Sequence, residues 1–232
     1  MKHSIEFYAL SEPGKVRTQN QDKIFISKFS LMKKKNYRKF VYFAVFDGMG
    51  GEQCGEKASQ IAVDTLRHYE NANVSLDDLC RHINKKICRY MKENSINRMG
   101  TTAAIIRVSN DSVTVCNIGD SRIYLKNSSG FKKMSVDHTM AIGRMHPRRV
   151  LTQHLGIPED EFYIEPYISS FKYDVGDKIL LCSDGLTDMV SEQKIEEILS
   201  ENNSENAGKQ LYNLAMENGG RDNISMIICE AK

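Results

Sequence analysis

The sequence predicts an α+β domain that is rich in antiparallel strands. Short β-branched or aromatic runs recur along the chain and are separated by turn residues, and stretches with helical periodicity lie between groups of such runs. The 232 residues can bury a substantial core, and no internal repeat or linker interrupts them. We therefore expect residues 1–232 to form a single domain.

The first hundred residues are expected to form three strands and then two helices. The strands are expected at residues 4–10, 22–29 and 39–46. The first helix, at 55–70, carries apolar residues at i, i+3 and i+4 spacing. The second helix is expected to begin at Ser75, because Asp78 follows three residues later in a capping-box arrangement.

The second half of the chain returns to strand patterns after Gly100. Four strands joined by short polar turns predict an antiparallel meander at residues 101–108, 112–118, 121–126 and 130–136. Residues 137–156 read as irregular. Further strands are expected at 162–169, 178–185 and 223–230, and helices at 192–200 and 204–218.

Charge and cysteine content exclude several classes of protein. The 32 basic and 30 acidic side chains leave a net charge of +2, which provides no drive toward nucleic acid or anionic membrane. The basic block at 33–39 is interpreted as a solvated loop. No apolar run approaches the ~18 residues of a membrane span. Six cysteines without a CxxC pair, and a start that lacks a signal-peptide pattern, favour free thiols in the cytoplasm.

Five aspartates share a position at the edge of an apolar strand: Asp22, Asp47, Asp120, Asp184 and Asp222. Any one of them alone is best explained as a turn residue, since Asp and Gly dominate turns. If the strand ends converge, however, five carboxylates would crowd together, and they could not all ionise without compensation. A bound divalent cation would remove that repulsion.

All-oxygen ligands favour Mg²⁺ or Mn²⁺ over zinc, and the chain contains no EF-hand loop for calcium. Two such ions about 4 Å apart can activate a hydroxide and clamp a phosphoryl oxygen. Gly48, directly after Asp47, would let a backbone carbonyl approach a metal. Arg17 could grip phosphate with its guanidinium, and an ordinary surface position for Arg17 is equally open.

Eight motifs occur in the order found in a known family. They are RTQNQD at 17–22, VFDGMGG at 45–51, GTT at 100–102, NIGDSR at 117–122, SVDHT at 135–139, LTQHLG at 151–156, LCSDGLTD at 181–188 and GGRDNIS at 219–225. Over nearly its whole length the chain resembles the bacterial branch of the metal-dependent serine/threonine protein phosphatases of type 2C. The resemblance implies a four-layer α-β-β-α sandwich of two antiparallel sheets flanked by helix pairs, with the metals in a cleft at one end.

The resemblance also implies a metal role for several residues. Asp47 matches the carboxylate that bridges two Mn²⁺ or Mg²⁺ ions, and Gly48 matches the residue that offers its carbonyl. Asp184 and Asp222 match the ligands that complete one ion. A third, weaker metal would lie at Asp120 together with Asp184.

The remaining roles concern the substrate and its hydrolysis. Asp22 matches an outer ligand that acts through water, and Arg17 matches the residue that grips the substrate phosphate. With Arg17, Asp47 and Asp184 as the catalytic set, the implied reaction is direct attack of a metal-bridged hydroxide on phosphoserine or phosphothreonine. The implied partners of this monomer are phosphorylated proteins and a bacterial-type serine/threonine kinase with its substrates.

Two features depart from the family pattern. Met49 stands where some members carry a His that protonates the leaving group, and Met has no proton to donate. His138 and His154 are candidates by residue type, although a structural role is the more common one. The flap beside the active site, at about 137–150, is shortened: only residues 140–145 separate two motifs that a longer helical flap usually separates.

Three hypotheses for the function stand against one another. The leading one is an active phosphatase that opposes a kinase. The second is a catalytically weak or inactive binding module with the same fold, which is disfavoured because Asp47, Asp184 and Asp222 are all retained. The third is a related phosphatase acting on phosphoserine anti-sigma antagonists in a regulatory cascade.

Overall fold

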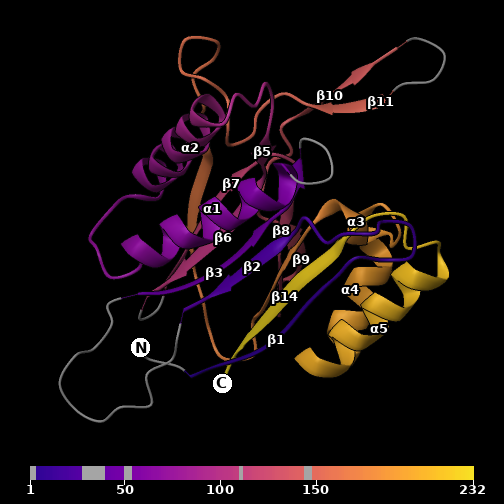
Figure 1. The fold of residues 1–232 in the computed structure, drawn as a ribbon. Helices are drawn as coiled ribbons and strands as arrows, with labels where there is room; N and C mark the ends of the chain where they lie inside the picture. The colour runs from indigo at the N-terminus through magenta and orange to yellow at the C-terminus, as the bar shows by residue number, and fades with distance from the viewer. Residues whose placement is uncertain (1–3, 28–39, 50–53, 110–111, 144–147) are drawn as a thin grey trace.

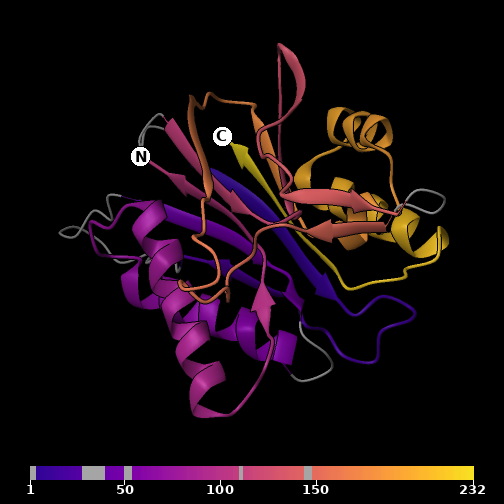
Figure 2. The same cartoon turned by 90° about the horizontal axis from the view of Figure 1, so that it is seen from above.

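A computed structural model describes residues 4–27, 40–49, 54–109, 112–143 and 148–232. Two five-stranded antiparallel sheets pack face to face, and each is covered on its outer side by helices. Figure 1 shows α1 and α2 beside one sheet and α4 and α5 beside the other. Figure 2, seen from above, shows the two helix pairs on opposite sides of the sheets. The predicted α+β class and the flanking helices are therefore confirmed.

The first sheet joins the two ends of the chain. Its strand order is β1, β14, β13, β8 and β9, with every neighbouring pair antiparallel. The register pairs Ile5 with Ala231, so the last strand lies between the first strand and the β13 strand. The bounds are β1 Ile5–Glu12, β8 Arg122–Asn127, β9 Gly130–Lys133, β13 Lys178–Cys182 and β14 Ile224–Ala231.

The second sheet has the order β12, β7, β6, β3 and β2. Its strands are β2 Lys23–Ile26, β3 Val41–Phe46, β6 Ala103–Val108, β7 Ser112–Ile118 and β12 Tyr167–Lys172. The helices are α1 Cys54–Tyr69, α2 Leu76–Glu93, α3 Asp184–Thr187, α4 Glu192–Glu201 and α5 Ser204–Glu217. Two short strands, β4 Gly48–Met49 and β5 Gly100–Thr101, pair beside this sheet.

Strand β3 shows why the sandwich has a core on both faces of a sheet. All six of its residues are buried. Phe43 and Val45 face the other sheet, whereas Ala44 and Phe46 pack in the cluster formed with α1 and α2. Alternate side chains of a strand point to opposite faces, so a strand covered on both sides must be apolar throughout.

The capping signal at the second helix is confirmed. Ser75 is the N-cap of α2, and its hydroxyl oxygen accepts a hydrogen bond from the Asp78 backbone N–H. The same hydroxyl donates to the Asp78 carboxylate at 2.7 Å. These bonds satisfy part of the unpaired first turn of the helix, which explains why the helix begins there.

The predicted meander is wrong in one respect. Strands β6 and β7 pair in the second sheet, whereas β8 and β9 pair in the first. The chain crosses between the sheets after Ile118, at Gly119, whose φ of +99° is a conformation that favours glycine. Short polar turns do not by themselves reveal whether the next strand stays in the same sheet.

The segment predicted as irregular contains a hairpin. Strands β10 Thr139–Ile142 and β11 Arg148–Leu151 pair antiparallel, with Thr139 opposite Leu151. In Figure 1 this hairpin projects away from the two sheets. The strand expected at 162–169 lies instead at Tyr167–Lys172. The basic block at 33–39, the glycines at 50–51 and residues 144–145 of the short flap lie outside the described residues.

The described helices give no sign of a membrane span. None of those within the ranges given above is both long enough and apolar enough to cross a bilayer.

Candidate active site

The five strand-edge aspartates gather at one end of the sandwich, because the strands that carry them are in register there. Lys23 pairs with Phe46, which places Asp22 and Asp47 side by side in the second sheet. In the first sheet Cys182 pairs with both Arg122 and Met226. The residues just beyond these pairs include Asp120, Asp184 and Asp222, so both sheets contribute carboxylates to the same end.

The backbone of Asp47 is held in place by two threonines. Its carbonyl oxygen accepts hydrogen bonds from the Thr101 hydroxyl and the Thr102 N–H, both at 2.8 Å. Its own N–H donates to the Thr102 hydroxyl at 3.1 Å. The Thr102 hydroxyl also lies 2.6 Å from that of Ser121, the residue after Asp120. Thr102 therefore ties Asp47 to the turn that carries Asp120.

These threonines belong to the GTT motif, to which sequence reasoning assigned no role. Ser121 was likewise not singled out, although it lies in the NIGDSR motif. The signal that could have found them is the placement of both motifs at the ends of buried strands. The bonds they make depend on which strand ends meet, and that pairing is a tertiary property.

Burial and mutual repulsion raise the pKa of the clustered carboxyl groups. Asp47 keeps a partly exposed surface, but its carboxyl group is withdrawn into the protein, and burial raises its pKa well above the usual range. The negative charges of Asp22, Asp184, Asp120 and Asp222 raise it further. Burial, followed by the charges of Asp120 and Asp222, raises the pKa of Asp184 to about 7. Burial also raises the pKa of Asp120.

Asp22 is the most deeply buried member of the cluster, with 2% of its surface exposed. Neither of its carboxylate oxygens has a hydrogen-bond partner within hydrogen-bonding geometry. Burial raises its pKa to about 6, although the nearby side chains of Ser225 and Ser183 partly offset this effect. An unpaired buried carboxylate is costly unless a proton or a cation compensates it.

The glycine after Asp47 is required by a close approach of α1. A Cβ added to Gly48 would lie 2.2 Å from the carbonyl oxygen of Gly55, in the first turn of α1. It would also lie 2.6 Å from the carbonyl oxygen of Gln21. Both neighbours are backbone atoms and cannot rotate away. The predicted role of the Gly48 carbonyl as a metal ligand remains a prediction.

Arg17 reaches the cluster through Asp222. Its Nε and Nη2 donate to the two Asp222 carboxylate oxygens at 3.0 and 2.7 Å. Both side chains are well exposed, at 55% and 40%. The bond to Asp222 raises the pKa of Arg17, and the charges of Asp184 and Asp47 add to this. The structure thus brings Arg17 to the predicted site.

The donor set fits a hard divalent cation. The site offers carboxylate oxygens and backbone carbonyls, and the buried Asp22 oxygens have no other partner. Within the described residues, no three acidic, His or Cys side chains already form a metal cage. Both oxygens of Asp222 are engaged by Arg17 in this structure.

Both candidate histidines are bound to backbone. The His138 Nδ1 accepts from the Gly119 N–H at 3.2 Å, and the backbone N–H of His138 donates to the Gly119 carbonyl at 2.9 Å. The His154 Nδ1 lies 3.1 Å from the Leu155 carbonyl oxygen. Burial lowers the pKa of both rings, which favours their neutral form. These bonds support the structural interpretation of the two residues.

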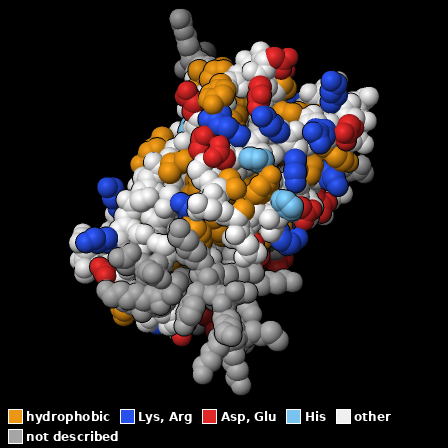
Figure 3. Space-filling view, turned by 90° about the vertical axis from the view of Figure 1, so that its left-hand side faces the viewer, with side chains coloured by type: hydrophobic (Ala, Val, Ile, Leu, Met, Phe, Trp, Pro, Cys, Tyr) orange, Lys and Arg blue, Asp and Glu red, His pale blue; other side chains and the backbone are white. Residues whose placement is uncertain are grey.

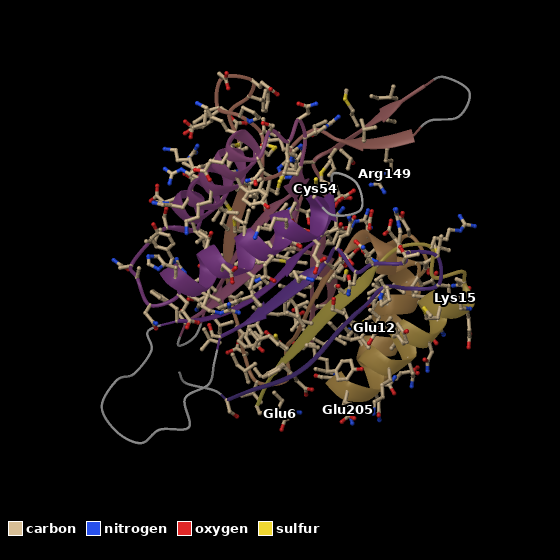
Figure 4. The ribbon with its side chains drawn as sticks, in the orientation of Figure 1. Glu6, Glu12, Lys15, Cys54, Arg149 and Glu205 are labelled. Carbon is tan, nitrogen blue, oxygen red and sulfur yellow. The ribbon has the colours of Figure 1, made fainter. Side chains whose placement is uncertain are left out.

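A cluster that sequence reasoning did not single out lies at the base of the hairpin. The Asp137 carboxylate pairs with Arg122 at 2.7 Å, Arg149 at 3.1 Å and Lys133 at 3.2 Å. Burial alone would raise the pKa of Asp137, but the bonds and charges of Arg122 and Lys133 outweigh it, so the pKa is lowered. Figure 4 labels Arg149 on β11, on the side of the hairpin that faces α3.

Comparison with known proteins agrees with this geometry. A family model described as protein phosphatase 2C matches residues 15–217. The serine/threonine phosphatase stp of Listeria innocua is 29% identical over 95% of this chain and 93% of its own length.

Two solved structures are similar over nearly their whole length. The Mycobacterium tuberculosis serine/threonine phosphatase PstP/Ppp is 28% identical, with a TM-score of 0.81 and coverage of 97% of this chain and 98% of its own. A catalytic domain of PstP in complex with two manganese ions is also 28% identical, with a TM-score of 0.79 and coverage of 98% of both chains. The chain belongs to the protein phosphatase 2C family, as a serine/threonine protein phosphatase of the bacterial type.

Proposed function

We propose that this phosphatase hydrolyses phosphoserine and phosphothreonine in proteins at the aspartate cluster, with two Mn²⁺ or Mg²⁺ ions. The observation that carries the proposal is the convergence of buried carboxylates whose pKa values are raised, including Asp22 with two unpaired oxygens. Such a cluster is compensated by divalent cations. The PstP domain that contains two manganese ions has the same fold.

Asp47, Gly48, Asp184 and Asp222 would hold the two ions, and Asp22 would support them through water. Asp120 together with Asp184 would hold a third, weaker ion. When bound, the ions supply a nucleophilic hydroxide and neutralise charge on the transferring phosphoryl group. The threonines behind Asp47 keep its carboxylate aimed at this point, because they fix its backbone from two sides.

Arg17 and Asp222 would exchange partners when the site is loaded. A guanidinium binds a phosphate as readily as a carboxylate, since both present paired oxygens to its fork of N–H donors. With Asp222 serving as a metal ligand, Arg17 would be free to donate to the substrate phosphate. The exposed pair costs little to open, because exposed ion pairs contribute ~1 kcal/mol or less.

Met49 cannot protonate the departing alkoxide, so another group must supply that proton. Methionine carries no exchangeable proton, and the two candidate histidines are held by backbone bonds. Residues 1–232 act as one catalytic domain in this proposal, with the β10–β11 hairpin in place of a longer flap.

The test is phosphate release from p-nitrophenyl phosphate and from a phosphothreonine peptide with added Mn²⁺. Asp184→Asn should lower kcat/KM about 1000-fold, since it removes one of the central charges, and EDTA should abolish turnover. Lys194→Gln, on the remote helix α4, is the matched control and should behave like the wild type. Turnover that ignores both the chelator and Asp184→Asn would contradict the proposal.

The cellular role that follows is the removal, in the cytoplasm, of phosphate groups that a serine/threonine kinase has added to proteins. The relatives are named as serine/threonine phosphatases, which supports phosphoproteins as substrates. A phosphoproteome of a deletion strain would test it, because kinase substrates should accumulate phosphate. Accumulation confined to an anti-sigma antagonist would instead support the regulatory-cascade alternative.

A further inference from the structure

A cavity of about 400 Å³ lies between the C-terminal end of α2 and the segment that joins β11 to β12. Its volume is within the range of sites that bind a side chain or a small ligand. Its wall mixes polar and apolar groups, and the apolar part is formed by Met91, Leu151, Ile157, Pro158 and Phe162. Figure 3 views the molecule from the side on which α1 and α2 lie, and hydrophobic side chains gather there among charges of both signs.

The polar groups that line this cavity can form hydrogen bonds with a peptide backbone. The Leu155 carbonyl can only accept, so the Nδ1 of His154 is the donor in their contact and Nε2 is left as an acceptor. His154 is 7% exposed and forms part of the cavity wall. Asn97 and Thr152 also line the cavity and can both donate and accept.

The charges at the cavity cancel. Arg98 and Glu161 both line it, so the site favours neither an anion nor a cation. Phe162 has 53% of its surface exposed, although it is a large apolar side chain. A half-exposed aromatic ring beside a mixed donor and acceptor wall is better suited to a neutral polypeptide segment than to a charged metabolite.

The cavity lies close to the catalytic end of the sheets. Leu155, beside His154, exchanges two backbone hydrogen bonds with Thr101, each 2.9 Å long. Thr101 pairs in turn with Gly48. Neighbouring strands are ~4.8 Å apart, so Gly48 and Leu155 are about 10 Å apart. An extended peptide at ~3.3 Å per residue covers this distance in about three residues.

We propose that this cavity anchors an apolar side chain of the phosphoprotein substrate, three to five residues from the phosphorylated Ser or Thr. The proposal rests on the phosphatase function proposed above. The anchor enters between Phe162 and Leu151, while the substrate backbone bonds with His154 and Thr152. The base of the β10–β11 hairpin, where the Thr152 N–H donates to the His138 carbonyl, lies between the cavity and the catalytic cluster. The peptide therefore passes over Thr152.

The first experiment varies the substrate. A set of phosphothreonine peptides, otherwise built of Ala, Gly and Ser, carries a single Phe at each position from two to eight residues on either side. We expect kcat/KM to peak at three to five residues on one side, by roughly fivefold or more over the peptide without Phe. A flat profile, or a peak only at two residues or at six to eight residues from the phosphothreonine, would overturn the proposal.

The second experiment varies the cavity. Phe162→Ala should raise KM for the best peptide roughly fivefold or more, with kcat unchanged, and should leave p-nitrophenyl phosphate kinetics unchanged. Tyr163→Ala is the matched control: Tyr163 is equally exposed, but its ring lies against Arg81 and not in the cavity. Equal KM values for Phe162→Ala and the wild type would refute the anchor.

Hydrolysis of p-nitrophenyl phosphate by the wild type distinguishes failure of the side-chain anchor from failure of the phosphatase function. If this turnover is present and the peptide profile is flat, the anchor fails while the phosphatase function stands. If it is absent with Mn²⁺, the phosphatase function itself fails. Phe162 is half-exposed, so its truncation leaves the core intact, and an unchanged thermal melt confirms that Phe162→Ala is folded.

Discussion

The charge of a single buried aspartate can either stabilise or destabilise the metal-free fold, depending on the groups around it. Asp22 is buried without a hydrogen-bond partner, whereas Asp137 is surrounded by Arg122, Lys133 and Arg149. The first charge destabilises the metal-free fold and the second stabilises it. The same chemical group is therefore a candidate for cation binding in one place and a structural ion pair in the other.

The pair of substitutions Asp22→Asn and Asp137→Asn tests this contrast. In EDTA, Asp22→Asn should raise the free energy of unfolding by about 1–2 kcal/mol, since it removes an uncompensated buried charge. Asp137→Asn should lower it by about 2–4 kcal/mol, because it removes the carboxylate charge closest to the partly buried Arg122. Urea unfolding followed by circular dichroism measures both. Stabilisation by neither, or by both, would contradict the assignment.

The raised pKa values of Asp184 and Asp22 predict how the metal-free protein responds to pH. Their folded-state pKa values, about 7 and about 6, lie above the unfolded value near 3.8. The stability that protonation provides is fully present below the unfolded pKa of 3.8 and is lost as pH rises from there to the folded pKa values of about 6 and about 7.

In EDTA the melting temperature should therefore be higher at pH 5 than at pH 8, by roughly 5 °C or more. Saturating Mn²⁺ should remove this fall, because the cations compensate the ionised carboxylates. Differential scanning calorimetry at the two pH values, with and without Mn²⁺, provides the measurement. A metal-free protein that is more stable at pH 8 would show that the carboxylates are not crowded.

At the scale of elements, the site depends on how α1 meets β4. The first turn of α1 touches Gly48 so closely that no side chain fits between them. The helix also covers the predicted ligand strand, since Ala58 and Ala62 pack in the cluster with Phe46. The position of the Asp47 carboxylate is thus set by helix packing as well as by the strand.

Gly48→Ala should push β4 and α1 apart, because the new Cβ would lie 2.2 Å from the Gly55 carbonyl oxygen. A displacement of ~1 Å at a catalytic centre costs about 100-fold in rate, so we expect kcat for p-nitrophenyl phosphate to fall by that factor. Mn²⁺ affinity, measured by calorimetry, should weaken in parallel. Activity at the wild-type level would show that the approach is not required.

At the scale of the whole molecule, the packing of the layers is apolar and lies away from the carboxylate cluster. Three separate apolar clusters hold the layers together: one between the sheets and one between each sheet and its helices. The first and last strands of the chain pair along the full length of β1 and β14, and β1 is an edge strand of the first sheet. The carboxylates lie at one end of this framework and outside the clusters.

EDTA should therefore abolish activity while leaving the secondary structure unchanged. Far-UV circular dichroism should be the same with and without Mn²⁺, and only the melting temperature should fall. A protein that loses its secondary structure on chelation would show that the cations, and not the three clusters, hold the sheets together.

The sequence by itself determined most of the elements and the residues of the candidate site. Strand and helix patterns such as 41–46 and the Ser75 cap depend on neighbours within a few residues, and local chemistry is visible in a sequence. Motif resemblance also pointed to Arg17 and the five aspartates, and the structure gathers them at one end of the sheets.

Only the tertiary structure decided how these parts meet. The crossing at Gly119, the β10–β11 hairpin and the Arg17–Asp222 pair all join residues by contacts between separate segments. The same is true of the Phe162 cavity, whose walls come from α2 and from the segment before β12. Local patterns state which face of a segment is apolar, but not which distant segment covers it, because that choice is made by packing.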